Sequence, residues 1–311
     1  MADIICTGTA LVDCIFSGGD HSGGYVDSIA LHPGGDAFNE AVNMARLGAE
    51  CALYCGLGTD FAGGMLSETA EKAGVDMSLA QVCAEAATPV SGLFVDSRGE
   101  RRSCVSAAHK IPFFRPDAEK CAGAKIVTMA SLFRPPFNDP AFTAAFARGV
   151  KEMGALLYID VKMPKNEQIC LRDFADTVAM ADFISPNETE AAYYSGASEP
   201  MAQARAFLDC GAKTVLLKLG GEGCLVVRES ERFHVPAYEV PVADGVGAGD
   251  AFAAGLLTAL SEGKPLREAC EWATAAAAIC VQSPGAVGGI RSRAQLEDFM
   301  KYPPKRREER K

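Results

Sequence analysis

VADGVGAGDAFAAGLL, residues 242–257, decides the fold expected of this chain, because a glycine-rich loop runs directly into an alanine-rich helix. Three glycines in five positions, Gly245, Gly247 and Gly249, permit a concave turn that exposes its backbone N–H groups, and alanines favour the helix that follows. The unpaired N–H groups of a first helical turn, together with the positive end of the helix dipole, form an anion site. We therefore expect this loop to hold a phosphate, or a phosphoryl group in transfer.

Asp250 stands where the glycine run meets the helix, and it has two interpretations. Aspartate is among the residues favoured as a helix N-cap. Transfer of a phosphoryl group to a hydroxyl, in contrast, needs a general base beside an anion site. On this stretch alone the cap and the base both remain open.

Two stretches resemble the signatures of the ribokinase-like (PfkB-type) carbohydrate kinases. Residues 244–250 resemble the second signature, D-T-x-G-A-G-D, with Gly245 in place of threonine. Residues 34–48, GGDAFNEAVNMARLG, meet every fixed position of the first signature, G-G-x-x-x-N-x-A-x-x-x-A-x-L-G. The chain most resembles uncharacterised bacterial sugar kinases of sugar-utilisation gene clusters, which share the G-G-D-A-x-N-E-A run, and this likeness names no substrate. The resemblance implies an ATP-dependent sugar kinase with Asp250 as general base and Gly247, Ala248 and Gly249 as the anion hole.

A second group of residues suggests where a sugar would bind. Asp36 and Asn39 lie in the first turn of a predicted helix, where short polar groups can pair with the hydroxyls of a polyol, although Asp36 would also suit a helix start. Asp13 follows the first predicted strand and could be only a turn carboxylate. The resemblance implies that Asp13, Gly35, Asp36 and Asn39 form one sugar-binding cluster. It also assigns Arg101 to a lid position, where its neighbour Arg102 is an alternative, and an arginine there would suit a sugar acid or another anionic sugar.

The nucleotide side is expected further along the chain. Asn187 and Glu190 match the family's N-x-x-E motif, and they also suit a helix start. Mg²⁺ keeps several waters and takes few carboxylates plus nucleotide phosphates, so Glu190 would act through water. Asp160 ends another predicted strand at the same edge and could line the phosphate region. The resemblance further assigns Lys218, Gly220 and Gly223 to the nucleotide, Ser283 and Gly285 to the loop beside the adenine, and Asp244 to a potassium site.

Apolar runs alternate with helical patterns over most of the chain, which predicts a single α/β domain over residues 1–311 with a doubly wound, mostly parallel sheet and helices on both faces. Ligands of such sheets bind beyond the carboxyl ends of the strands. Two segments, at about 12–33 and 88–108, do not follow this alternation of strands and helices, and they predict a small β-sheet lid. The predicted strands are 4–7, 52–55, 125–129, 156–159, 183–185 and 215–218, and the predicted helices lie near 37–47, 62–73, 141–153, 187–195, 201–210, 250–261, 266–281 and 293–301.

Composition narrows the class of protein. Thirty basic against forty acidic residues give a formal charge of −10, which argues against nucleic acid as the main partner. Twelve cysteines without a C-x-x-C pair indicate reduced thiols of a cytoplasmic protein. No signal peptide and no apolar run of roughly eighteen residues is present, so we expect no membrane span. Residues 302–311 are predicted to be a frayed, charged end, and an exposed lid face suggests a homodimer through the lid.

Two alternatives to a sugar kinase remain. A nucleoside kinase of the same fold would use the same carboxylate cluster, since Asp13 and Asp36 suit any ribose or hexose. A non-catalytic sugar-binding regulator would have no need of Asp250 as a base, and the presence of Asp250 argues against it. P-loop, G-x-S-x-G and H-E-x-x-H motifs are absent, and Phe61 stands where a dinucleotide fingerprint needs glycine.

Overall fold

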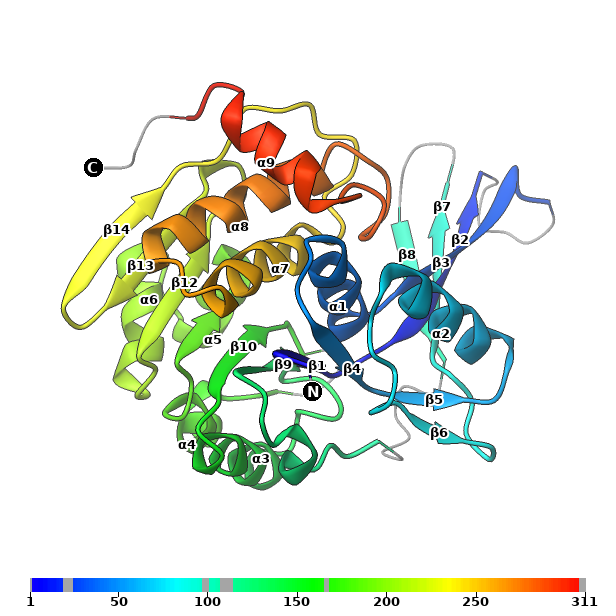
Figure 1. Ribbon diagram of the computed structural model, residues 1–311, viewed down its shortest axis with the longest axis horizontal. Coiled ribbons are helices and arrows are strands. Elements are labelled where there is room, and N and C mark those ends of the chain that lie inside the picture. The colour runs from blue at the N-terminus through cyan, green and yellow to red at the C-terminus, as the bar shows by residue number, and fades with distance from the viewer. Residues whose placement is uncertain (1, 19–24, 97–100, 107–113, 165–167, 308–311) are drawn as a thin grey trace.

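A large β-sheet forms the central layer of the molecule (Figure 1). The computed structural model describes residues 2–18, 25–96, 101–106, 114–164 and 168–307, with only the backbone of 101–103. Within these ranges the central sheet has eight strands in the order β14-β13-β12-β11-β10-β9-β1-β4. The parallel strands of this sheet are β1, β4, β9, β10, β11 and β12. β13 and β14 form an antiparallel hairpin at one edge. The strands are β1 (Ile4–Thr7), β4 (Cys51–Tyr54), β9 (Ile126–Leu132), β10 (Leu156–Val161), β11 (Phe183–Ser185), β12 (Thr214–Lys218), β13 (Cys224–Arg228) and β14 (Glu231–Val235).

Helices cover both faces of this sheet, as predicted for a doubly wound fold (Figure 1). Each face has its own apolar core, and the parallel strands between them are buried on both sides, which is why they are near-continuous apolar runs. Every predicted helix is present, with ends shifted by at most two residues. One face carries α1 (Asp36–Arg46), α2 (Phe61–Ala73), α7 (Ala248–Ser261), α8 (Leu266–Cys280) and α9 (Arg293–Lys301). The other carries α3 (Pro140–Glu152), α4 (Ala175–Val178), α5 (Glu188–Ser195) and α6 (Pro200–Asp209), and the short 3-10 turns are η2 (Ala118–Cys121), η3 (Leu171–Phe174) and η4 (Gly220–Glu222).

The predicted lid is a separate four-stranded sheet of order β3-β2-β7-β8 (Figure 1). It holds Phe16 and Phe94 stacked with ring centroids 4.6 Å apart. On its edge strand β3, Ile29 is 60% and Leu31 43% exposed. Within the predicted lid segments, residues 19–24, 97–100 and 107–108 lie outside the described residues. The lid strands are β2 (Leu11–Ser17), β3 (Ser28–Gly34), β7 (Val90–Val95) and β8 (Arg101–Val105), and β5 (Gly56–Gly58) with β6 (Gln81–Cys83) form a short pair beside them.

The topology places the ligand site at strand β1. β1 pairs in parallel with β4 on one side and with β9 on the other, so the chain builds the sheet outward in two directions from this strand. A switch of this kind leaves a crevice beyond the carboxyl ends of the strands. The loops that follow β1, β9, β10, β11 and β12 therefore converge on one edge, which is where the sequence predicts the site.

The C-terminal segment differs from the frayed end that the sequence predicts. Residues 305–307 are hydrogen-bonded to 237–239, with an antiparallel bridge between Tyr238 and Arg306. Charge and two prolines indicated a solvated tail, but the partner strand is more than sixty residues away in sequence and could not be foreseen. Residues 308–311 lie outside the described ranges. None of the described helices is long and apolar enough to cross a membrane.

Candidate active site

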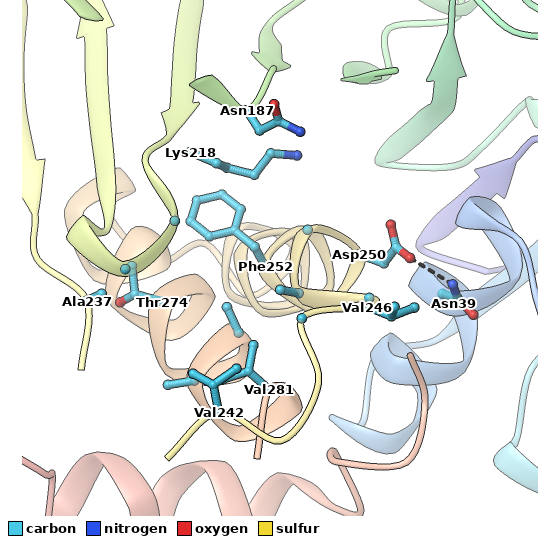
Figure 2. Close-up of a pocket in the computed structure, with 18 of the residues that line it drawn as sticks. Asn39, Asn187, Lys218, Ala237, Val242, Val246, Asp250, Phe252, Thr274 and Val281 are labelled. Atoms are coloured by element: carbon cyan, nitrogen blue, oxygen red, sulfur yellow. Dashed lines mark hydrogen bonds between the residues drawn. The ribbon is translucent and has the colours of Figure 1, made fainter. Parts of the chain in front are cut away.

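A cavity of about 910 Å³ runs along the carboxyl edge of the sheet, from the lid to the C-terminal segment. It is lined by residues of both signature stretches, by the ends of β10, β11 and β12, and by residues 237–242. Figure 2 shows Asn39 and Asp250 at one end, with Asn187 and Lys218 facing the same space and an apolar group around Val242 and Val281 at the other. One continuous cavity thus connects the predicted sugar and nucleotide regions.

The glycine loop forms the N-terminus of α7. The N-cap is Gly247, whose φ of 78° is left-handed and favours glycine. A Cβ at Gly247 would lie 2.4 Å from Ala286, so the close approach of these two loops also requires glycine. Ala248 and Gly249 are the first residues of the helix, and their backbone N–H groups belong to its first turn, where no carbonyl four residues earlier in the helix accepts from them. The Ala248 N–H makes a long 3.4 Å hydrogen bond to the Gly245 carbonyl.

Asp250 is the third residue of α7, so its interpretation as the N-cap is wrong. The left-handed Gly247 takes the cap position instead, three residues before Asp250, and the helix begins at Ala248. The Asp250 side chain is only 4% exposed and accepts a 2.8 Å hydrogen bond from Nδ2 of Asn39 (Figure 2). Burial, with the nearby carboxylates of Asp36 and Asp160, raises the pKa of Asp250 to about 6, against the lowering effect of Lys162. A carboxylate with a pKa close to neutral is suited to accept a proton.

Lys162 is a site residue that the sequence reasoning missed. Its Nζ lies 3.2 Å from Asp36, 3.0 Å from Asp160 and 3.5 Å from Asp250. Although burial opposes it, these three carboxylates raise the pKa of Lys162 well above its usual value, so the ammonium stays charged. The available signal was the spacing Asp160-Val161-Lys162 at the end of a predicted strand, which directs two opposite charges to the same side.

The sugar end brings together the predicted substrate residues. Asp13, Gly35, Asp36 and Asn39 all line the cavity, joined by Arg134 and by Thr9, Leu11 and Ser91, which were not predicted. Asp36 accepts a 2.5 Å hydrogen bond from Oγ of Ser131. Burial acts to raise the pKa of Asp36, but Lys162, Ser131 and Arg134 hold it below its ordinary value, so the group is an anion.

A glycine at the start of α1 allows two segments of the sugar end to approach closely. Gly35 is the N-cap of α1, with φ 98°, and a Cβ there would lie 2.5 Å from the carbonyl oxygen of Thr9. The glycine therefore lets the loop after β1 approach the start of α1, which brings Asp13 and Asp36 to the same cavity.

The predicted lid arginine is described only in part. The backbone of Arg101 lies in β8, paired with Val95, while the side chains of Arg101 and Arg102 lie outside the described residues.

The phosphate region is built on two strand ends. Lys218 ends β12, and its Nζ is 2.5 Å from Asp160, which is fully buried at the end of β10. The same Nζ lies 3.3 Å from the position that a Cβ on Gly249 would take, so the ammonium stands directly beside the glycine loop. Asp160 therefore bridges Lys162 and Lys218 and holds two positive charges at the N-terminus of α7.

Asn187 and Glu190 form the capping box of α5, which supports the helix-start interpretation of this pair. Oδ1 of Asn187 accepts from the Glu190 N–H at 2.9 Å, and Oε2 of Glu190 accepts from the Asn187 N–H at 2.8 Å. Both residues also line the cavity, and burial raises the pKa of Glu190. Among the described residues no three His, Cys, Asp or Glu side chains gather as a metal site. A cation here would therefore need further ligands from a nucleotide, as Mg²⁺ commonly does.

The far end of the cavity is mainly apolar. Gly220, Gly221 and Gly223, which follow Lys218 at the end of β12, form the wall that leads to this end, and Tyr238, Arg307 and Thr274 add polar groups. The apolar lining of this end consists of Val240, Val242, Phe252, Ala277, Ala278 and Val281. A flat apolar slot with a few polar groups suits a nucleobase.

The last two predicted loop residues lie elsewhere. Ser283 lines a separate cavity of about 340 Å³, and Gly285 is absent from the described lining of the large one. The Gly285 N–H donates to Oδ2 of Asp244 at 3.0 Å, and Oδ1 of Asp244 accepts from Val246 at 3.1 Å. Asp244 thus braces the glycine loop against the loop after α8. An added Cβ at Gly245 would meet nothing within 4 Å, so the missing threonine leaves open space.

Comparison with known proteins agrees with this geometry. The model of the pfkB family carbohydrate kinases matches residues 1–293. An aminoimidazole riboside kinase of Salmonella typhimurium is 31% identical over 294 residues, covering 86% of this chain and 88% of that protein. A ribokinase of Haemophilus influenzae is 29% identical, covering 86% of this chain and 87% of the relative.

Solved structures show the same fold. A ribokinase of Thermotoga maritima superposes with a TM-score of 0.81 at 26% identity, covering 97% of this chain and 100% of that one. The ribokinase of Arabidopsis thaliana complexed with ribose and ATP superposes with a TM-score of 0.85 at 24% identity, covering 97% and 99%. The fold, the two signature stretches and the family match agree, and the chain belongs to the pfkB family of carbohydrate kinases.

Proposed function

We propose that this kinase transfers the γ-phosphoryl group of ATP to a hydroxyl of a sugar or sugar derivative, with Asp250 as the general base. The observation that carries the proposal is the position of Asp250. It lies in the first turn of α7 and in one cavity with Asp13 and Asp36, the carboxylates that we expect to bind the acceptor hydroxyls. The acceptor oxygen would lie near Asp36 and Asn39, and the γ-phosphoryl group over Gly247, Ala248 and Gly249.

The reaction then follows from the placement of charges. The acceptor O–H gives its proton to Asp250 as its oxygen bonds to the γ-phosphorus, the bond to the bridging oxygen breaks, and ADP leaves. Unpaired N–H groups of α7 are placed to stabilise the negative charge on the phosphoryl oxygens. Mg²⁺, when bound with ATP, supplies further charge neutralisation, and Glu190 with Asn187 are the residues we assign to it, through water.

We assign Lys162 to the balance of charge around the base. Its ammonium offsets the carboxylates of Asp36, Asp160 and Asp250 and favours the ionised form of Asp250. Asp160 in turn keeps Lys162 and Lys218 in place beside the loop. The transferring group would thus meet one base, two ammonium groups and a helix N-terminus.

The acceptor that we propose belongs to one of several classes of sugar. Relatives include aminoimidazole riboside kinase, ribokinase, a fructokinase and 2-dehydro-3-deoxygluconokinase, so ribosides, free sugars and a sugar acid are all candidates. Arg134 lines the sugar end, which favours including anionic sugars in the search. A nucleoside kinase remains the main alternative, and a non-catalytic regulator is disfavoured by the intact base.

Three further assignments complete the proposal. Both carboxylate oxygens of Asp244 already accept backbone N–H groups, so a potassium ion would be held chiefly by backbone carbonyls of this loop. Comparing the activity in KCl and in NaCl at equal ionic strength would test the potassium site.

The twelve cysteines, all in described positions, are free thiols, which supports a cytoplasmic location. The exposed edge strand β3 supports a homodimer through the lid, and a monomeric mass by light scattering at micromolar concentration would contradict it.

A panel of sugars, sugar acids and nucleosides tests the function directly. Each is mixed with MgATP and the protein, and the release of ADP is measured. Turnover with at least one panel member, and loss of that turnover in Asp250→Asn, is expected. No turnover with any of them, together with tight binding of one, would replace the kinase proposal with the regulator.

A further inference from the structure

The C-terminal segment lies against the nucleotide end of the cavity. The Glu239 N–H donates to the Lys305 carbonyl at 2.8 Å, and the Arg307 N–H donates to the Ala237 carbonyl at 3.0 Å. Residues 305–307 therefore extend 237–239 as a short antiparallel pair. Since 237–242 is a wall of the cavity, the last described residues of the chain brace that wall by pairing with it.

Side chains strengthen this brace. The Arg306 guanidinium lies 4.3 Å from the centre of the Tyr238 ring and donates to its hydroxyl. Tyr238 is 6% exposed and packs edge-on against Phe299 of α9, with ring centroids 5.0 Å apart. Arg306 is thus occupied by Tyr238 and is not among the residues that line the cavity, and the alternation along an extended chain directs the next residue to the opposite side.

Arg307 is the residue that reaches the cavity. It lines the cavity itself, and its Cζ, Nη1 and Nη2 are each 3.5 Å from the position that a Cβ on Gly221 would take. Equal distances mean that the plane of the guanidinium faces the glycine turn, so its N–H donors, which lie in that plane, run along the cavity wall. In the part of the chain that the structure describes, Arg307 forms no salt bridge.

We propose that Arg307 is a nucleotide-binding residue that contacts the phosphate of the bound nucleotide nearest its ribose, and that residues 305–307 are a structural part of the nucleotide site. The inference rests on the proposed function for the direction in which ATP lies. Gly221 is three residues beyond Lys218, which stands beside the glycine loop, so the turn under Arg307 lies between the phosphoryl-transfer point and the apolar slot. That interval is where the proximal phosphate of a nucleotide passes, and a guanidinium matches phosphate oxygens in geometry and charge.

Calorimetric titration with ATP, AMP and adenosine tests this without an acceptor sugar. In Arg307→Ala we expect affinity for ATP and for AMP to fall about five- to tenfold, as for loss of a partly exposed charge-assisted hydrogen bond, with adenosine affinity within about twofold. Arg205→Ala, which removes an exposed arginine from α6, is the control for net charge and should leave all three unchanged. A chain ending at Pro304 should lose at least as much ATP affinity as Arg307→Ala, because the brace is lost as well.

The outcomes are distinct. ATP affinity within twofold of wild type in Arg307→Ala overturns the inference, and an equal loss for adenosine overturns the assignment to phosphate. Tyr238→Phe, which keeps the ring but removes the acceptor of the Arg306 hydrogen bond, should weaken ATP about two- to threefold with little change in melting temperature. If wild-type protein binds no ATP at all, the proposed function fails first, and that result is separate from failure at Arg307.

Discussion

Asn39 of α1 donates a 2.8 Å hydrogen bond to Asp250 of α7, and this contact ties the helix that we propose binds the sugar to the helix that carries the proposed base. The two residues are 211 positions apart, and each belongs to a different signature stretch. The amide stabilises the ionised carboxylate and also fixes its direction at the cavity (Figure 2). In the proposed mechanism, substrate binding and proton acceptance are therefore coupled through the Asn39 side chain.

Asn39→Ala should impair catalysis through the base. Without the amide, the pKa of Asp250 should rise further and its carboxylate should lose its fixed direction, so we expect kcat to fall about tenfold or more at neutral pH. The matched control is Asn43→Ala, one turn further along α1, whose buried amide donates to the Ala286 carbonyl at 3.3 Å and not to Asp250. A similar kcat loss in both variants would indicate a general effect on α1 and contradict the role of Asn39.

The pH dependence of kcat/KM should show an acidic limb near pH 6. Asp250 has a pKa of about 6, raised mainly by burial, and only its ionised form accepts a proton. As the pH falls through 6 the base becomes protonated, so kcat/KM should drop about tenfold per pH unit below that point. An acidic limb at pH 4, where an ordinary carboxyl titrates, would show that Asp250 is not the group that controls the rate.

Lys162→Met should move that limb upward. The ammonium opposes the effects of burial and of neighbouring carboxylates on Asp250, so its removal should raise the pKa of Asp250 and shift the limb toward neutral pH. Lys162→Arg keeps the positive charge, so the acidic limb should stay within about half a pH unit of its wild-type position. The kcat of this variant can still fall, because the planar guanidinium is larger than the ammonium and fits the site poorly. An unshifted limb in Lys162→Met would assign Lys162 a purely structural role.

The glycine loop offers a matched pair of substitutions. Gly247→Ala introduces a side chain at φ 78° and 2.4 Å from Ala286, so we expect loss of about 1–3 kcal/mol of unfolding free energy and most of the activity. Gly245→Ala meets open space at an ordinary φ and should be neutral or slightly stabilising. Thermal unfolding and turnover of the two variants check this, and equal destabilisation of both would contradict the described loop.

The sequence predicted the features that are contiguous along the chain. The loop at 247–249, the start of α1 at Asp36 and the strand and helix alternation each depend on neighbouring residues, and the structure brings Asp13, Asp36, Asn39 and Asp250 to one cavity. The N-cap at Gly247 in place of Asp250 was missed because it depends on the left-handed φ of Gly247 and on its close approach to Ala286, a residue distant in sequence.

Features made by distant segments could not be predicted. Lys162 gains its significance only when Asp36, Asp160 and Asp250, from three different elements, surround it. The pairing of residues 305–307 with 237–239 likewise has no local pattern. Ser283 follows α8 as expected but faces a different cavity, because the loop after α8 is turned toward Asp244.

Asp250→Asn is the most direct test of the central claim, because it keeps the shape and the partner Asn39 while removing the base. With the acceptor identified by the panel, kcat of this variant should fall roughly 10²–10⁴-fold while calorimetry shows ATP binding within a few-fold of wild type. If turnover stays within about threefold of wild type, Asp250 is not the general base and the proposed mechanism is wrong.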